Sequence, residues 1–194
     1  GCYLKGTIRV DDRAANLDAC SIEENERILD LGCGAGGLSR YFARRGGLVT
    51  AIDCDRQLVE QTRLLANLAE LKVEAYTCDL EFDFPEGTFD TVLALGILPN
   101  VSDPKNLADM IEKTGCQRVI VECGINEINY RWQGSEYHKV HVAWAFSHSQ
   151  DLQDYLQFLF QGFSLRELKR TSDKRFLFAL TRKCGKNDCP AEAS

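Results

Sequence analysis

Residues 27–37 read RILDLGCGAGG, an apolar run that ends in an aspartate and a cluster of glycines. The apolar run predicts a strand at residues 27–31, and the periodic residues 36–45 predict a helix directly after the glycines. Glycines let the backbone turn sharply and approach a ligand closely. The start of a helix adds unbonded N–H groups and the positive end of a dipole. The stretch therefore predicts a strand, a ligand-binding loop and a helix in succession.

Further apolar runs and helical patterns alternate along the chain on both sides of this loop. Strands are predicted at residues 27–31, 48–53, 72–78, 89–95, 117–123, 163–170 and 174–182, and helices at 36–45, 55–71, 104–114 and 149–161. In the helix at 55–71, an apolar face is expected from Leu58, Leu64, Leu65, Leu68 and Leu71. Alternating strands and helices predict an α/β fold, a doubly wound and mostly parallel sheet with helices on both faces. The last two strands, joined by Thr171, Ser172 and Asp173, must pair antiparallel, which places one antiparallel strand near the edge.

The domain organisation follows from where this alternation starts and stops. Residues 1–22 are weakly patterned, with a short helix expected near 11–20, and are interpreted as an N-terminal lid. Residues 23–183 form the ligand-binding domain, and residues 184–194 are a polar tail. Within the domain, residues 124–147 hold two Trp, two Tyr and two His without a clear period. We interpret that segment as a long functional loop or insertion on the substrate side.

Composition excludes several classes of protein. The 194 residues suit one domain, and no apolar run approaches the roughly 18 residues that a membrane helix needs. The nine cysteines are odd in number and mostly lie in apolar segments, which favours reduced thiols in a cytoplasmic protein. Cys184 and Cys189 form a tight pair without further ligands nearby, so no metal site is predicted.

Acidic residues follow each of the first three strands and indicate the kind of ligand. Asp53 ends the second strand, 21 residues after Gly32, where a carboxylate can accept the two hydroxyls of a ribose. Gly32, Gly34 and Gly37 also satisfy the dinucleotide spacing G-x-G-x-x-G. Two acids favour a different nucleotide. Asp30 suits an amino-acid ammonium better than a pyrophosphate, and Asp79 suits the exocyclic amine of adenine.

Four segments together resemble the class I S-adenosylmethionine-dependent methyltransferases: RILDLGCGAGGLSRYFARRG, VTAID, CDL and FDTVLALGIL. The resemblance covers about residues 23–183 and implies a seven-stranded sheet with the last strand antiparallel. It implies S-adenosylmethionine as cofactor and S-adenosylhomocysteine as product. The residues that would bind the cofactor are Asp30, Gly32, Cys33, Gly34 and Gly36 for the methionine part, Asp53 with Cys54 for the ribose, Asp79 with Leu80 for the adenine, and Leu95 beside the sulfonium.

The chain departs from many small-molecule members of this superfamily, because residues 97–101, after the fourth strand, contain no histidine. The candidate bases are therefore Glu122, His138 and His141. Histidine titrates near neutrality and suits the removal of a proton from an acceptor. The alternative is that Glu122 caps a strand or pairs with Arg131, and that both histidines are exposed loop residues.

Four functions remain open from the sequence. The leading hypothesis is methyl transfer to an oxygen or nitrogen of a small metabolite, sugar or glycan. The second is an RNA methyltransferase, because residues 166–186 carry eight Lys or Arg and two acids, against a net charge of −6 for the whole chain. An NAD-dependent oxidoreductase is disfavoured by Asp30 and Asp79. The fourth is a non-catalytic module that keeps the fold and binds a partner protein; the oligomeric state is not predicted.

Overall fold

A computed structural model describes residues 17, 20–125, 127–133, 136–144, 146, 148–171 and 175–183. For residues 127–133 and 136–144 this description covers the backbone. The helix predicted near 11–20, the turn residues 172–174 and the tail from 184 lie outside the described residues, apart from Leu17 and Cys20, which are both buried.

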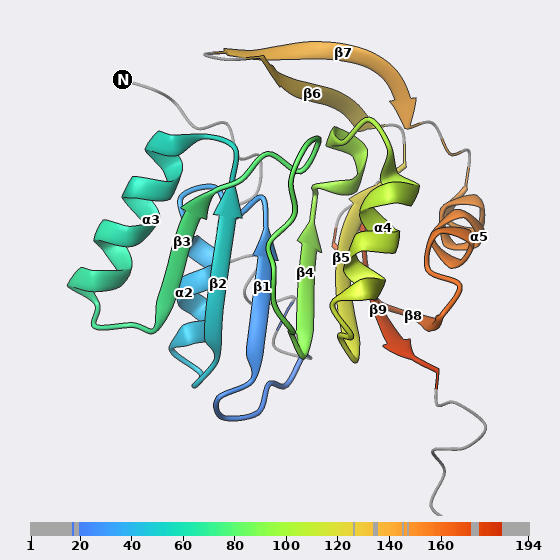
Figure 1. Cartoon of the computed structure of the whole chain (residues 1–194). Coiled ribbons are helices and arrows are strands. Elements are labelled where there is room, and N and C mark those ends of the chain that lie inside the picture. Colours follow the sequence, from blue (N-terminus) through green and yellow to red (C-terminus); the bar gives the residue numbers. More distant parts are fainter. Residues whose placement is uncertain are drawn as a thin grey trace, which may run out of the picture.

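Seven strands form one sheet in the order β3-β2-β1-β4-β5-β9-β8 (Figure 1). The strands from β3 to β5 are parallel to their neighbours, while β9 is antiparallel to both β5 and β8. Their bounds are β1 (Arg27–Leu31), β2 (Leu48–Asp53), β3 (Val73–Thr77), β4 (Thr91–Leu95), β5 (Arg118–Gly124), β8 (Phe163–Arg170) and β9 (Arg175–Arg182). The predicted α/β sheet with one antiparallel strand near its edge is confirmed.

Helices cover both faces of this sheet. They are α2 (Gly37–Ala43), α3 (Arg56–Leu68), α4 (Pro104–Lys113) and α5 (Ser149–Leu159), with a 3-10 turn, η1 (Leu98–Asn100), after β4. Asp55 and Asp103 cap α3 and α4, because their side chains accept the backbone N–H groups of Gln57 and Asn106. Pro104 occupies the first turn of α4, as predicted.

The core lies between the sheet and these helices. On one face, α4 and α5 bury their apolar side chains against β4, β5 and β9, with Leu156 and Phe178 fully buried. On the other face, α2 and α3 bury Phe42 and Val59 against β2. A fully buried Leu or Phe side chain contributes about 1.5–3 kcal/mol, so this core holds the carboxyl ends of the strands in fixed positions.

The apolar face predicted for the helix at 55–71 is wrong in part. Leu64 and Leu68 are 59% and 74% exposed. The side of α3 that meets the sheet carries Val59, Thr62 and Ala66 instead. A small residue such as Ala66 lets the helix approach the sheet closely, which turns the larger leucines outward.

The segment at 124–147, predicted to be a long loop or insertion, is not a long loop. The chain forms an antiparallel hairpin of β6 (Glu127–Gln133) and β7 (Glu136–Trp144), in which Gln133 pairs with Glu136. Figure 1 shows this hairpin beyond the carboxyl ends of the parallel strands, and β6 contacts η1. The sequence did carry a hairpin signal, since Gly134-Ser135 separates two runs rich in aromatic and β-branched residues.

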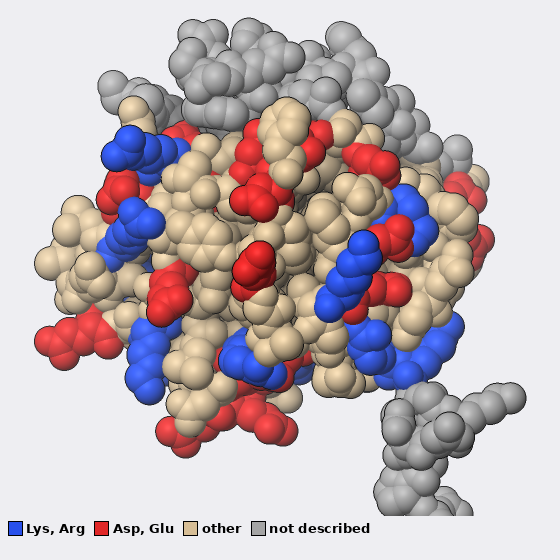
Figure 2. Space-filling model, viewed as in Figure 1, with Lys and Arg blue, Asp and Glu red and all other residues tan. Residues whose placement is uncertain are grey.

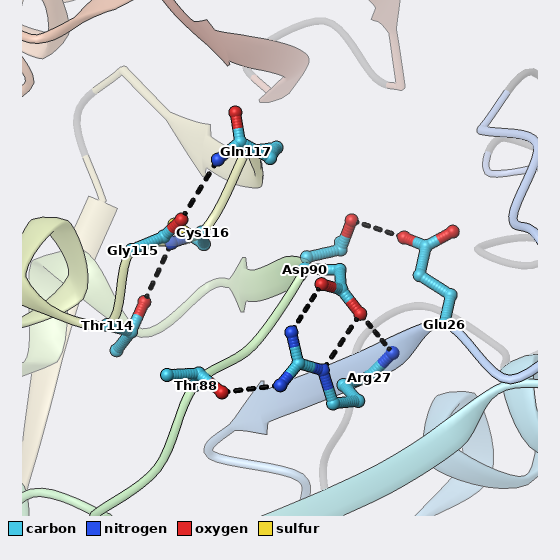
Figure 3. A network of polar contacts seen from close by, with 9 residues as sticks. Glu26, Arg27, Thr88, Asp90, Thr114, Gly115, Cys116 and Gln117 are labelled. Carbon is cyan, nitrogen blue, oxygen red and sulfur yellow. Dashed lines mark hydrogen bonds and ion pairs between the residues drawn. The ribbon is translucent and has the colours of Figure 1, made fainter.

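The opposite, amino edge of the sheet is tied together by polar contacts (Figure 3). Arg27 donates from its backbone N–H to Asp90 Oδ2 (2.9 Å) and from its guanidinium to Asp90 Oδ1 (2.8 Å). This ion pair lowers the pKa of Asp90. Arg118 similarly pairs with Glu26 at 2.7 Å. These contacts join the starts of β1, β4 and β5 and so fix the register of these three central strands at the amino edge. The same register sets where the strands end at the carboxyl edge.

Candidate functional site

The loop between β1 and α2 has an unusual backbone. Gly32, Gly34 and Gly36 have φ values of 68°, 55° and 66°, in the left-handed region that side chains disfavour. The sequence offered both Gly36 and Gly37 as the third glycine of the loop. In the structure, Gly36 has the left-handed backbone and is the N-cap of α2. The loop lies at the carboxyl edge of the sheet, where ligands bind in folds of this kind.

Side chains from three other parts of the chain hold this loop in place. The Gly34 N–H donates to Asp53 Oδ2 at 2.9 Å, and the Gly34 carbonyl accepts from Thr62 Oγ1 at 3.1 Å. The next carbonyl, that of Ala35, accepts from the Arg40 guanidinium at 2.7 Å. Three consecutive peptide groups are thus held by side chains from β2, α3 and α2.

The space around the glycines differs from one to the next. A Cβ added at Gly32 would lie 2.9 Å from Ile97 Cδ1, and one added at Gly36 would lie 2.4 Å from Thr62 Cγ2. A Cβ at Gly34 would meet no atom of the described residues within 4 Å. Among these residues, the backbone of Gly34 therefore borders open space on the side away from its supports, as a ligand-binding loop requires.

Asp30 and Asp53 lie on either side of this loop, and both are buried. Asp30 is 3% exposed and accepts a 2.6 Å hydrogen bond from Ser39 Oγ. Asp53 is 7% exposed and accepts the backbone N–H groups of Gly34 and Asp55, each at 2.9 Å. Burial raises the pKa of Asp53, although those two hydrogen bonds oppose the shift. A carboxylate has about four acceptor positions, so Asp53 can support the loop and still accept ligand hydroxyls.

Asp79 and Leu80 follow β3 and are half-buried. The backbone N–H of Glu81 donates to Asp79 Oδ1 at 3.1 Å, which orients that carboxylate. The Glu81 side chain in turn accepts the Ser102 N–H at 2.6 Å. This second hydrogen bond attaches the segment after β3 to Ser102, just before the start of α4.

The end of β4 completes the same edge of the sheet. Leu95 is 9% exposed, and the N–H of the following Gly96 donates to the Glu122 carbonyl at 2.7 Å. Asn100, in η1, donates from its side chain to the Gly96 carbonyl at 2.6 Å. This turn borders the glycine loop, because a Cβ added at Gly32 would lie 2.9 Å from Ile97 Cδ1. Asp30, Asp53, Asp79 and Leu95 therefore lie at or next to the ends of four adjacent strands, at one edge of the sheet.

Glu122 is the one predicted base whose side chain is among the described residues. It lies near the end of β5, is 2% exposed, and has Thr171 Oγ1 at 3.3 Å and Arg175 at 3.4 Å. Arg175 begins β9 and is the register partner of Gly124. The alternative pairing with Arg131, and the side chains of His138 and His141 on β7, lie outside what the structure describes.

Cysteines also border the site. Cys33 and Cys54 are half-buried, Cys78 is buried, and all three are free thiols. Burial is the main cause that raises the pKa of Cys33, and it raises that of Cys78 to about 11. Such thiols stay protonated at neutral pH and behave as packing groups. Within the described part of the chain, no three His, Cys, Asp or Glu side chains gather in a way that would suit a metal ion.

The sequence did not single out several residues that shape the site: Ser39, Arg40, Thr62, Ser102 and Arg175. Thr62 and Ser39 are polar residues on the buried faces of amphipathic helices, and that position was the available signal. Ser102 and Arg175 carry no local signal, because they reach the site only through the tertiary fold.

Away from this edge, the described residues form a further cavity and a surface of mixed charge. A separate cavity of about 660 Å³ opens mostly at the amino ends of β1, β2 and β3, and its lining includes Lys72, Tyr76 and Glu86. On the face drawn in Figure 2, described Lys and Arg side chains are interspersed with Asp and Glu and form no continuous basic band. None of the described helices is long and apolar enough to cross a membrane.

Comparison with known proteins places this geometry in a family. The family profile described as "Methyltransferase domain" matches residues 28–124, which is half of the chain. A ubiquinone biosynthesis O-methyltransferase of Xanthomonas oryzae pv. oryzae (strain PXO99A) is 37% identical over 99 residues, covering 50% of this chain and 40% of that protein. The chain thus matches less than half the length of this curated relative.

Two solved structures show the same fold. Magnesium protoporphyrin IX methyltransferase from Synechocystis PCC 6803, with bound SAH, superposes with a TM-score of 0.64 at 19% identity, over 90% of this chain and 82% of that one. An S-adenosylmethionine-dependent methyltransferase from Clostridium acetobutylicum ATCC 824 gives a TM-score of 0.69 at 12% identity, over 93% and 94% of the two chains. The glycine loop and the carboxyl ends of β1, β2, β3 and β4 lie inside the matched region, and the chain belongs to the methyltransferase domain family, in the class I, Rossmann-like form.

Proposed function

We propose that this protein transfers a methyl group from S-adenosylmethionine to an oxygen or nitrogen atom of a small metabolite, sugar or glycan. The observation that carries the proposal is the Gly34 backbone, which is held on both sides and borders open space, beside the buried carboxylate of Asp53. A ligand with a ribose and a small amino-acid part fits such a loop and carboxylate.

The residues at the carboxyl edge have chemically suitable positions for each part of this cofactor. Asp30 and the loop from Gly32 to Gly36, including Cys33, would hold the methionine part. Asp53 with Cys54 would accept the ribose hydroxyls, Asp79 with Leu80 would contact the adenine, and Leu95 would lie beside the sulfonium. When bound, the cofactor supplies a methyl group on a positively charged sulfur. The neutral thioether that forms when the methyl group is transferred is an excellent leaving group.

The protein's own contribution is then to align the acceptor and to exclude water. We propose the hairpin of β6 and β7 for this role, because it extends beyond the carboxyl edge and contacts η1 (Figure 1). Glu122, His138 and His141 remain the proposed groups that take a proton from the acceptor. Arg175 and Thr171 hold the buried Glu122 near the end of β5, and we propose that Glu122 also orients an acceptor without leaving these partners.

An oxygen of a small molecule is the favoured acceptor. The curated relative is a ubiquinone biosynthesis O-methyltransferase, and its similarity supports this choice. A methyltransferase for RNA is the second candidate. The exposed Arg166, Lys169 and Arg170 on the edge strand β8 favour it, but the mixed charges in Figure 2 favour a small substrate. The free thiols at Cys33, Cys54 and Cys78 support a reducing, cytoplasmic location.

The proposal is tested by following S-adenosylhomocysteine formed from S-adenosylmethionine in the presence of small phenols, amines, sugars, glycans and short RNAs. Turnover that requires a small-molecule or glycan acceptor and is lost in Asp53→Ala supports it. Turnover only with RNA, falling steeply with salt, would establish the second candidate. Cofactor binding without turnover on any acceptor would favour a non-catalytic module that binds a partner protein.

A further inference from the structure

We propose that Thr62, on the buried side of α3, is a positioning residue that sets the affinity for the cofactor without touching it. The inference rests on the proposed function. Thr62 is fully buried, and its hydroxyl donates to the Gly34 carbonyl at 3.1 Å. No motif of the sequence points to it, since it lies 28 residues after Gly34 on a helix that follows the next strand.

The first part of its role is a hydrogen bond. Gly34 has a left-handed φ of 55° and is bonded at both ends, to Asp53 through its N–H and to Thr62 through its carbonyl. Asp53 also belongs to the proposed ribose site, so its carboxylate has to serve both the loop and the ligand. Thr62 serves the loop alone, which makes it the support that remains in place when a ligand approaches Asp53.

The second part of its role is steric. The Thr62 side chain fills the space beneath Gly36, where an added Cβ would lie 2.4 Å from Cγ2 and 2.6 Å from Oγ1. The loop therefore cannot sink toward α3. One side chain thus both anchors Gly34 and supports Gly36, the two glycines on either side of Ala35.

These contacts matter for affinity because glycines have many backbone conformations available. The apparent affinity of a ligand falls in proportion to the fraction of protein in the binding conformation. If loss of the Thr62 hydrogen bond reduces that fraction to between about a fifth and a tenth, binding weakens by about five- to tenfold.

Substitution can separate the two parts. Thr62→Val keeps the shape beneath Gly36 and removes the hydroxyl, whereas Thr62→Ser keeps the hydroxyl. Thr114→Val is the matched control. Thr114 is also buried, its hydroxyl also donates to a backbone carbonyl, that of Ile111 at 2.7 Å, and it lies at the end of α4, at the amino edge of the sheet.

The test is titration calorimetry of S-adenosylhomocysteine with the full chain, with thermal unfolding measured in parallel. We expect Thr62→Val to weaken binding about five- to tenfold, Thr62→Ser to stay within about twofold of wild type, and Thr114→Val to bind as wild type. Both valine variants should lower the unfolding temperature, so stability alone would not separate them.

Two results would overturn the inference while leaving the proposed function intact: wild-type affinity in Thr62→Val, or equal weakening by Thr62→Val and the control Thr114→Val. A wild-type chain that does not bind S-adenosylhomocysteine would instead overturn the proposed function, and the role of Thr62 with it.

Discussion

Gly34→Ala should weaken cofactor binding strongly at little cost to the fold. Gly34 has a φ of 55°, and a Cβ there would meet no atom of the described residues within 4 Å. The new methyl group therefore clashes with none of these residues, and the expected cost is that of the left-handed backbone, about 1–2 kcal/mol. In a domain of this size that lowers the unfolding temperature by about 2–8 °C.

The cofactor is affected far more, because the added methyl occupies the space that we assign to it. Moving the ligand outward by the width of a methyl group forfeits on the order of two hydrogen bonds, each worth about 1 kcal/mol. The affinity for S-adenosylhomocysteine should then fall by about thirtyfold or more.

Gly115→Ala is the matched control for this experiment. Gly115 has a φ of 77°, its added Cβ would also meet no described atom within 4 Å, and it follows α4 at the amino edge of the sheet. Both variants should lose similar stability in urea unfolding, while calorimetry should show weakened binding only for Gly34→Ala. Wild-type affinity in Gly34→Ala would refute the assignment of the open space to the cofactor.

Three further expectations concern the same edge of the sheet. Gly36→Ala should cost about 2–4 kcal/mol in urea unfolding, since it adds a clash with Thr62 to the left-handed strain; a loss no larger than that of Gly34→Ala would contradict the packing. The pKa of Asp53 in the folded protein is raised above its ordinary value of 3.8. Protonated Asp53 therefore stabilises the folded state at pH values below 3.8, and this stabilisation is lost as the pH rises through the folded pKa. The free energy of unfolding of wild type relative to Asp53→Asn should therefore decline across this window, and a rise would contradict the direction of the shift. With a pKa of about 11, about one Cys78 thiol in a thousand is ionised at pH 8, so iodoacetamide followed by peptide mass spectrometry should find Cys78 unmodified in native protein and modified after denaturation.

Much of the fold could be predicted because its signals are local. The strand at residues 27–31, the glycines after it and Asp53 at the end of the next strand are close in sequence, and alternation of strands and helices leaves few topologies. The antiparallel β9 followed from the short connection to β8 alone. Local patterns of this kind are sufficient to locate the carboxyl edge of the sheet, and with it the proposed cofactor residues.

The parts that could not be predicted depend on contacts between distant residues. Leu64 and Leu68 look like core in the helical pattern, yet Ala66 and Thr62 face the sheet because close packing there needs small side chains. Pairing of Glu122 with Arg131 was one alternative from the sequence, and it lies outside the described residues. The contact from Arg175 was not expected, because Arg175 reaches Glu122 across the pairing of β5 and β9. The dual use of Asp53, as a support of the loop and as a proposed ribose ligand, was likewise invisible in the sequence.

The most direct test of the cofactor assignment is thermal unfolding of the full chain with S-adenosylhomocysteine, with NAD as the control. A ligand at about 100 times its Kd stabilises the folded state by about 2.7 kcal/mol, which corresponds to a rise of about 5–10 °C in a domain of this size. We expect that rise with S-adenosylhomocysteine, no rise with NAD, and no rise with either ligand in Asp53→Ala. A rise with NAD alone, or none with S-adenosylhomocysteine, would contradict the assignment of Asp30, Asp53 and Asp79 to an S-adenosylmethionine site.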